Sequence, residues 1–98
     1  MVTYFHGSKK LIKGLLAKGS CISPVKGNAL RFALRHSRGR DCYIYVLQLN
    51  PKDLEQRKDD AGAIDNKLVR ATTFSERILV TDKLIAECSA ESIANDLV

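Results

Sequence analysis

Apolar and polar residues alternate along several parts of the chain with the two-residue period of a β-strand. The clearest such segment is 42–49, where Tyr43, Tyr45 and Leu47 alternate with further apolar residues. We therefore expect both faces of this strand to be largely buried. Residues 2–5 form another apolar run and predict a short strand. Further short strands are expected over residues 21–23, 67–71, 76–81 and 85–88.

Helical spacing occurs in fewer places. Leucine and isoleucine recur four residues apart within 10–18, which predicts a short helix or an irregular turn. Ser23 followed by proline is a favourable helix start, and this helix is expected to run to about His36. Ser89 is expected to cap a final short helix over 90–97.

The polar segment 55–66 contains no aromatic residue and is interpreted as a flexible loop or a short helix. The expected order is therefore strand, helix, short strand, helix and then mostly strands. This order predicts an α+β fold with an antiparallel or mixed sheet, in a single domain over 1–98.

Composition narrows the class of protein. No apolar run is long enough for a membrane span, and lysines from Lys9 onward interrupt the N-terminal apolar stretch, so no signal peptide is expected. Cys21, Cys42 and Cys88 are odd in number and lack metal-ligand spacing, so we expect reduced thiols, no metal site and a cytoplasmic protein.

Charge is distributed unevenly along the chain. Residues 1–40 contain five Lys and four Arg but no acidic residue, whereas residues 41–98 contain seven basic and eleven acidic residues. A basic half of this kind favours a polyanionic partner, either nucleic acid or the pyrophosphate of a ligand. The alternative is a solvated surface that only keeps the protein in solution.

Three short segments carry candidate chemistry. The first is His6-Gly7-Ser8, where an imidazole and a backbone amide without a Cβ neighbour each other at the end of the first strand. The second is the short strand at 21–22 with Ser23, followed by a helix that bears Phe32. The third places Glu76 before an apolar run.

In this order, the three segments resemble the cofactor site of ADP-ribosyltransferases of the diphtheria-toxin and poly-ADP-ribose-polymerase type, the His-Tyr-Glu branch. The resemblance implies that His6 contacts a ribose hydroxyl of NAD and that the Gly7 backbone holds the nicotinamide amide, with Ser8 as a nearby hydroxyl. Phe32 stands where the family commonly has a tyrosine that stacks on nicotinamide. Cys21 or its neighbour replaces the middle tyrosine of the triad.

The resemblance further implies that Glu76 is the catalytic carboxylate, which stabilises positive charge on the ribose and deprotonates the incoming nucleophile. Taken alone, Glu76 is better explained as a structural surface residue at a strand edge, and it is the order of the three segments that favours the catalytic interpretation. Ser23 lies in the second segment and is included in the cofactor site. Arg70 either faces the same cleft and touches phosphate, or pairs with Asp65 or Glu76.

The implied fold is a minimal split β-sandwich, in which two small sheets face each other across a cleft, with two or three short helices. The implied activity is transfer of ADP-ribose from NAD to a protein or nucleic-acid acceptor with release of nicotinamide, in a toxin-like stand-alone domain. One alternative is a catalytically degenerate member of the same fold that binds nucleic acid or a protein partner. Another is a small nucleic-acid-binding α+β domain that uses 9–40 as a basic face.

Overall fold

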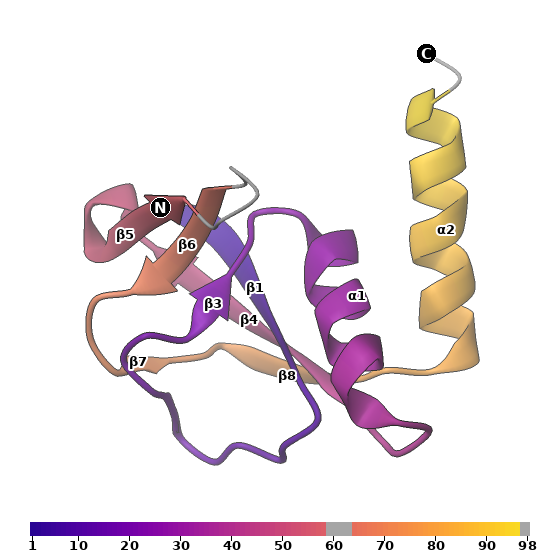
Figure 1. The fold of residues 1–98 in the computed structure, drawn as a ribbon, viewed down its shortest axis with the longest axis horizontal. Helices are drawn as coiled ribbons and strands as arrows, with labels where there is room; N and C mark the ends of the chain where they lie inside the picture. The colour runs from indigo at the N-terminus through magenta and orange to yellow at the C-terminus, as the bar shows by residue number, and fades with distance from the viewer. Residues whose placement is uncertain (59–63, 97–98) are drawn as a thin grey trace.

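Strand β1 joins two antiparallel sheets in the computed structural model, which describes residues 1–58 and 64–96. One sheet has the order β1-β4-β8 and the other β3-β6-β5, while β2 and β7 form a separate pair. Figure 1 shows the arrangement. In chain order the elements are β1 (Val2–Ser8), β2 (Leu15–Leu16), β3 (Cys21–Ile22), α1 (Lys26–Ser37), β4 (Tyr43–Leu49), a 3-10 turn (Pro51–Asp53), β5 (Leu54–Lys58), β6 (Ile64–Leu68), β7 (Thr72–Thr73), β8 (Glu76–Leu79) and α2 (Asp82–Asp96).

The strand pairing is antiparallel throughout the described residues. Strands β1 and β4 pair over their full length, from Val2 opposite Leu49 to Ser8 opposite Tyr43. Phe5 and Ser23 form an isolated bridge that links β1 to the segment after β3. With two α-helices in 1–58 and 64–96, the structure confirms the expected α+β class with antiparallel sheets.

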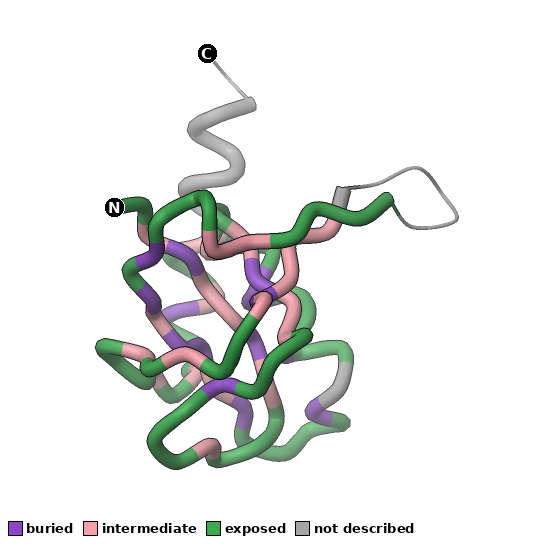
Figure 2. The backbone as a smooth tube through the Cα atoms, turned by 90° about the vertical axis from the view of Figure 1, so that its left-hand side faces the viewer, coloured by how far each residue is buried: buried purple, intermediate pink, exposed green. Residues whose placement is uncertain are grey.

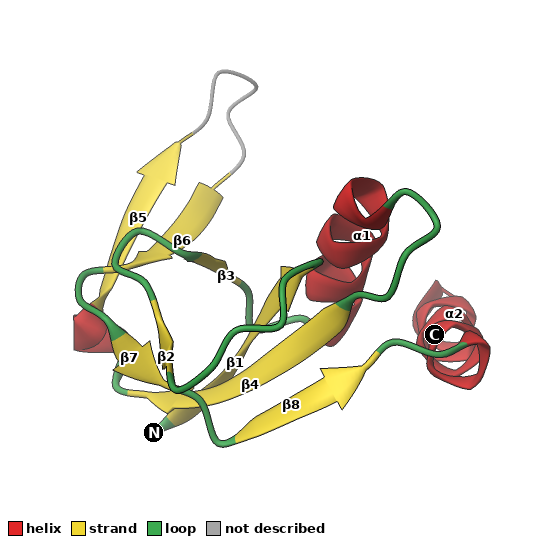
Figure 3. Ribbon diagram, turned by 90° about the horizontal axis from the view of Figure 1, so that it is seen from below, coloured by secondary structure: helices red, strands yellow, loops and turns green. Residues whose placement is uncertain are grey.

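The β1-β4-β8 sheet separates two apolar clusters because its side chains alternate between its two faces. On one face, Tyr4, Tyr45 and Leu47 pack with buried residues of β2, β3 and β6. On the other face, Ile44 packs with α1 and α2 through Leu30 and Leu84. Figure 2 shows the buried positions along the backbone, and Figure 3 shows the helices beside the sheet. The expected burial of both faces of β4 is confirmed at Ile44, Tyr45 and Leu47, which are all fully buried.

The segment between β1 and β3 is not helical, contrary to one of the two interpretations of 10–18. The buried hydroxyl of Tyr45 donates to the Lys10 carbonyl at 2.7 Å and accepts from the Ile12 amide at 2.6 Å. Leu15 and Leu16 then pair with β7. Backbone groups that a helix would use internally are therefore bonded to a side chain and to another strand.

Two further expectations are wrong. Within 55–66, the chain forms β5 and the start of β6 in place of a loop or a helix. The two strands pair from Leu54 opposite Leu68 to Lys58 opposite Ile64. Residues 59–63 lie outside the described part of the chain.

The expected strand at 85–88 belongs to α2, so Ser89 lies within a helix and does not begin one. The Thr81 hydroxyl accepts from the Leu84 amide at 3.2 Å, as in a helix cap. Leu84 is buried against α1 and β4, with Ile85 and Cys88 packed beside it, because all three fall on one helical face.

Gly7 lets α1 lie directly on β1. A β-carbon at Gly7 would overlap the carbonyl oxygen of Ala29 and would come within 3.0 Å of the Ala33 nitrogen. Both alanines are themselves almost completely buried. The absent side chain is therefore required by helix packing, whereas the sequence interpretation assigned it to close approach of a ligand.

We predict that Gly7→Ala lowers the free energy of unfolding by about 3 kcal/mol or more, because backbone atoms of α1 cannot move away locally. The measurement is urea unfolding followed by circular dichroism. Gly27→Ala is the matched control, since a β-carbon at Gly27 meets nothing within 4 Å. This helical substitution should be neutral or stabilise by up to about 1 kcal/mol. Equal stability of the two variants would contradict the packing argument.

Candidate functional site

A cavity of about 620 Å³ lies where β1 and β3 part, beside the first turns of α1. This volume is in the range of about 300–1,000 Å³ that small-molecule sites occupy. The residues that bear on its chemistry come from four elements and the β3–α1 connection. They are Gly7, Cys21, Ser23, Asn28, Arg31, Phe32, Arg35, Asp65 and Asn66.

The backbone of Gly7 faces this cavity. Phe5 donates its amide to the Ser23 carbonyl at 2.7 Å and accepts from the Ser23 amide at 2.9 Å, so its backbone groups point away from β4. Gly7 is two residues further along β1, and the period of a strand directs its N–H and C=O toward the same edge. No strand pairs with β1 beyond the Phe5–Ser23 bridge on that edge, within the residues described. The cavity thus offers one backbone donor and one acceptor.

Ser23 shapes the entry of the chain into α1. Its hydroxyl accepts from the Val25 amide at 3.0 Å and from the side-chain amide of Asn28 at 3.3 Å. Helix α1 begins at Lys26 with Val25 as N-cap, so the expected capping role of Ser23 is wrong by two residues. Ser23 instead forms a tight turn that sets the wall of the cavity.

Phe32 lies at the rim of the cavity with 41% of its surface exposed. Ala29 and Ala33 on the same helix are buried against β1, so the helix turns its small residues to the sheet. Phe32 is therefore not part of the core. An aromatic ring of this kind can stack on a planar ligand.

Asp65 and Asn66 bring polar groups to the cavity from β6. Asp65 is the only acidic residue among those that line this hollow in the described structure. The Oδ1 atom of Asn66 is buried and has no hydrogen-bond partner among the described residues. An unsatisfied buried acceptor is costly, so this atom is a local weakness in the packing beside the cavity.

His6 does not line the cavity. It shares a sheet face with Tyr45, its cross-strand neighbour, and the two ring centroids lie 6.2 Å apart. Its Nδ1 lies 2.6 Å from the carbonyl oxygen of Cys21. Because a carbonyl only accepts, Nδ1 carries the hydrogen and donates. Burial lowers the pKa of His6 below its ordinary value, although the hydrogen bond to Cys21 opposes this effect. His6 thus fixes β3 against β1 and holds one wall of the site.

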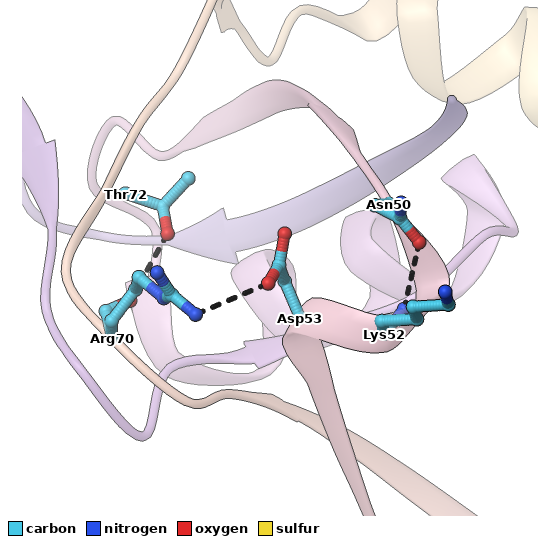
Figure 4. A network of polar contacts seen from close by, with 5 residues as sticks. All are labelled: Asn50, Lys52, Asp53, Arg70 and Thr72. Carbon is cyan, nitrogen blue, oxygen red and sulfur yellow. Dashed lines mark hydrogen bonds and ion pairs between the residues drawn. The ribbon is translucent and has the colours of Figure 1, made fainter.

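Three residues expected in the site lie elsewhere. Ser8 accepts a hydrogen bond from the Lys10 amide at 3.0 Å and does not line the cavity. Arg70 does not touch the cavity, because its Nη2 is paired with Asp53 Oδ1 at 3.2 Å, as Figure 4 shows. Neither Asp65 nor Glu76 is its partner. Glu76 is exposed on β8, two strands away from β1, and is not a lining residue.

Comparisons of the chain with protein-family models, with curated proteins and with solved structures found no match. Within the part of the chain that the structure describes, no helix has the length and apolar character to cross a membrane. Cys21, Cys42 and Cys88 are free thiols.

Sequence reasoning found Gly7, Cys21, Ser23 and Phe32 but missed Asp65 and Asn66. Both lie in a segment that the sequence analysis interpreted as a loop or a helix. In the structure this segment is strand β6, and its pairing with β3 brings both residues to the cavity. The signal that could have found them is the alternation of Ile64, Asn66 and Leu68, which is weakened by the amide in its centre.

We predict that His6 makes the fold less stable as pH falls below its ordinary pKa of 6.5. The unfolded imidazole takes up a proton in this window while the folded one, with its lowered pKa, resists it, so stability rises with pH. The measurement is the free energy of unfolding by urea between about pH 7 and about pH 5. His6→Asn keeps an N–H donor but does not titrate, so its stability should change less over this window. Parallel pH profiles of the two proteins would contradict this role.

Proposed function

We propose that this chain is a minimal NAD-dependent ADP-ribosyltransferase-like domain, whose cavity holds the nicotinamide end of the dinucleotide. The observation that carries the proposal is one hollow that combines the Gly7 backbone edge, the Phe32 ring and the Asp65 carboxylate. The first two are groups that the sequence resemblance assigned to nicotinamide, and they lie on separate elements. Their meeting in one cavity supports the resemblance.

The residues present fit a carboxamide and a planar ring. A carboxamide has donors on nitrogen and an acceptor on oxygen, and the Gly7 edge offers the complementary C=O and N–H. Phe32 can stack on the ring, and Arg31 and Arg35 line the same hollow, where they can pair with a pyrophosphate.

Asp65 takes the role that the sequence assigned to Glu76. The dinucleotide supplies an ADP-ribosyl group whose leaving group is nicotinamide. A carboxylate that lines the cavity can stabilise positive charge that develops beside it and can accept a proton from an acceptor hydroxyl. Glu76 is exposed and outside the cavity, so it cannot act on a group held there without a rearrangement of the sheet.

The architecture is consistent with a split β-sandwich. Two three-stranded sheets meet at the Phe5–Ser23 bridge and part beside it, and the cavity lies at the parting. We propose that this parting is the cleft of the ADP-ribosyltransferase fold.

A second candidate function is a binding module that no longer turns over the dinucleotide. Two observations favour it. Cys21 stands where a triad tyrosine is expected, and the His6 Nδ1 is bonded to the Cys21 carbonyl and lies outside the cavity. Such a module would bind ligand in the cavity without releasing nicotinamide.

We predict that Asp65→Asn lowers nicotinamide release from NAD by about 10²-fold or more, because the neutral amide no longer stabilises positive charge. Release is measured by chromatography under single-turnover conditions, and NAD binding by calorimetry should change little. Glu87→Gln is the matched control, since Glu87 is an exposed carboxylate on α2.

Loss of turnover in Glu76→Gln with full activity in Asp65→Asn would overturn the assignment and return the role to β8. Calorimetric binding to the wild type without any nicotinamide release would favour the binding module. No binding of NAD to the folded wild type would refute the proposed cofactor.

We predict that Phe32→Ala weakens NAD binding about 2- to 12-fold, through loss of a stacking partner worth about 0.5–1.5 kcal/mol. Leu34→Ala is the control, because Leu34 is similarly exposed on α1 and does not line the cavity. Calorimetric titration of both variants is the measurement. An unchanged affinity in Phe32→Ala would remove the ring from the site.

A further inference from the structure

A second hollow, of about 710 Å³, adjoins the cavity and is lined almost entirely by cations. Arg35 lines both hollows, so they lie on either side of, or next to, that side chain. We call the second hollow the basic groove. Its residues are Lys9, Lys10, Arg35, Ser37, Arg38 and Arg40.

Short-range hydrogen bonds hold both walls of the basic groove. One wall follows β1, where the Lys10 amide donates to the Ser8 hydroxyl at 3.0 Å. The other follows α1, where the buried Ser37 donates its hydroxyl to the Leu34 carbonyl at 3.1 Å. The Arg40 amide in turn donates to the Ser37 carbonyl at 3.0 Å. The backbone of the groove is therefore set by the fold before any ligand arrives.

The cations of the basic groove lack acidic partners. Among the described residues, the ion pairs are Arg57–Glu55 and Arg70–Asp53, and neither involves the groove. Asp41 follows the groove in sequence but does not line it. Like charges gathered in one hollow repel each other, so an anionic ligand relieves this repulsion as well as gaining direct pairs.

We propose that the basic groove binds the phosphate backbone of a single-stranded nucleic acid and, on the basis of the proposed function, leads it to the cavity as the acceptor of ADP-ribose. Arg31 and Arg35 are one helical turn apart on α1 and both line the cavity, so they extend the cations of the groove toward Asp65. A row of cations is better matched by a linear polyanion than by a single phosphate group.

The shape of the groove favours one strand. Proteins that bind single strands use a positively charged groove that follows the phosphate backbone, and the basic groove is a hollow of this kind. Among the described residues, no large apolar side chain lines it, whereas amphipathic surfaces that enter a lipid interface present an apolar face. Its ligand is therefore recognised by phosphate.

The test is fluorescence anisotropy of a short labelled single-stranded RNA, titrated with the full chain at several KCl concentrations and without NAD. Lys9→Gln/Arg40→Gln should weaken binding at least 10-fold. It should also flatten the slope of log affinity against log salt by about 1.4, or about 0.7 for each lost phosphate contact. The control is Lys52→Gln/Lys83→Gln, which removes the same charge from exposed positions outside the groove. It should keep the wild-type slope.

The proposal is overturned by equal weakening in both double variants, which would show a net-charge effect alone. It is also overturned by tighter binding of a duplex of the same sequence, of a polyglutamate peptide of matched charge or of phosphatidylserine vesicles. Because NAD is absent from this titration, the outcome is independent of turnover. Labelled RNA that binds in the groove but gains no ADP-ribose from an enzyme that releases nicotinamide would overturn the acceptor assignment alone.

Discussion

Two backbone hydrogen bonds between Phe5 and Ser23 are the constraint on which the rest of the structure depends. They are the bridge between the sheet that contains β1 and the sheet that contains β3. The bridge is antiparallel, so Cys21 would lie opposite Gly7 if the ladder continued along β1. The Cys21 carbonyl is bonded to His6 Nδ1 instead. β1 continues to Ser8 without a partner on that edge, within the described residues. The cavity lies at this interruption, where β1 goes on to Ser8 and no longer pairs with β3.

Because side chains alternate along β1, the adjacent residues His6 and Gly7 contact different parts of the structure. Gly7 lies on the face covered by α1 and lets the helix approach, while its backbone edge faces the cavity. His6 lies on the opposite face and donates to the Cys21 carbonyl, which holds β3 in place. The pair therefore builds the site from two directions. A substitution at either residue changes the distance between β1, β3 and α1, so its effect on ligand binding has to be separated from its effect on stability.

Local patterns predicted the elements whose residues are set by their own neighbours. The β4 strand and α1 were found because alternation and a helix-start signal are visible within a few residues, although α1 begins at Lys26 and not at Ser23. The burial expected for β4 is confirmed. The structures of segments 10–18 and 55–66 were not predicted correctly, because contacts with residues far away in the sequence determine them. The Tyr45 hydroxyl takes the backbone groups of Lys10 and Ile12, and β5 and β6 are stabilised by pairing with each other. The site was predicted only in part for the same reason, since its acidic residue, Asp65, lies on β6.

The fold brings charged residues from the basic and the acidic parts of the sequence to the same cavity. All the cations of the basic groove and both arginines of the cavity come from the first forty residues, whereas Asp65 comes from the acidic remainder. A lone carboxylate in a cavity would repel a polyphosphate ligand. Arg31 and Arg35 line the same cavity and offset that repulsion. In the proposed function, this pairing of charges from the two halves of the sequence is what would allow a carboxylate and phosphates to share one site.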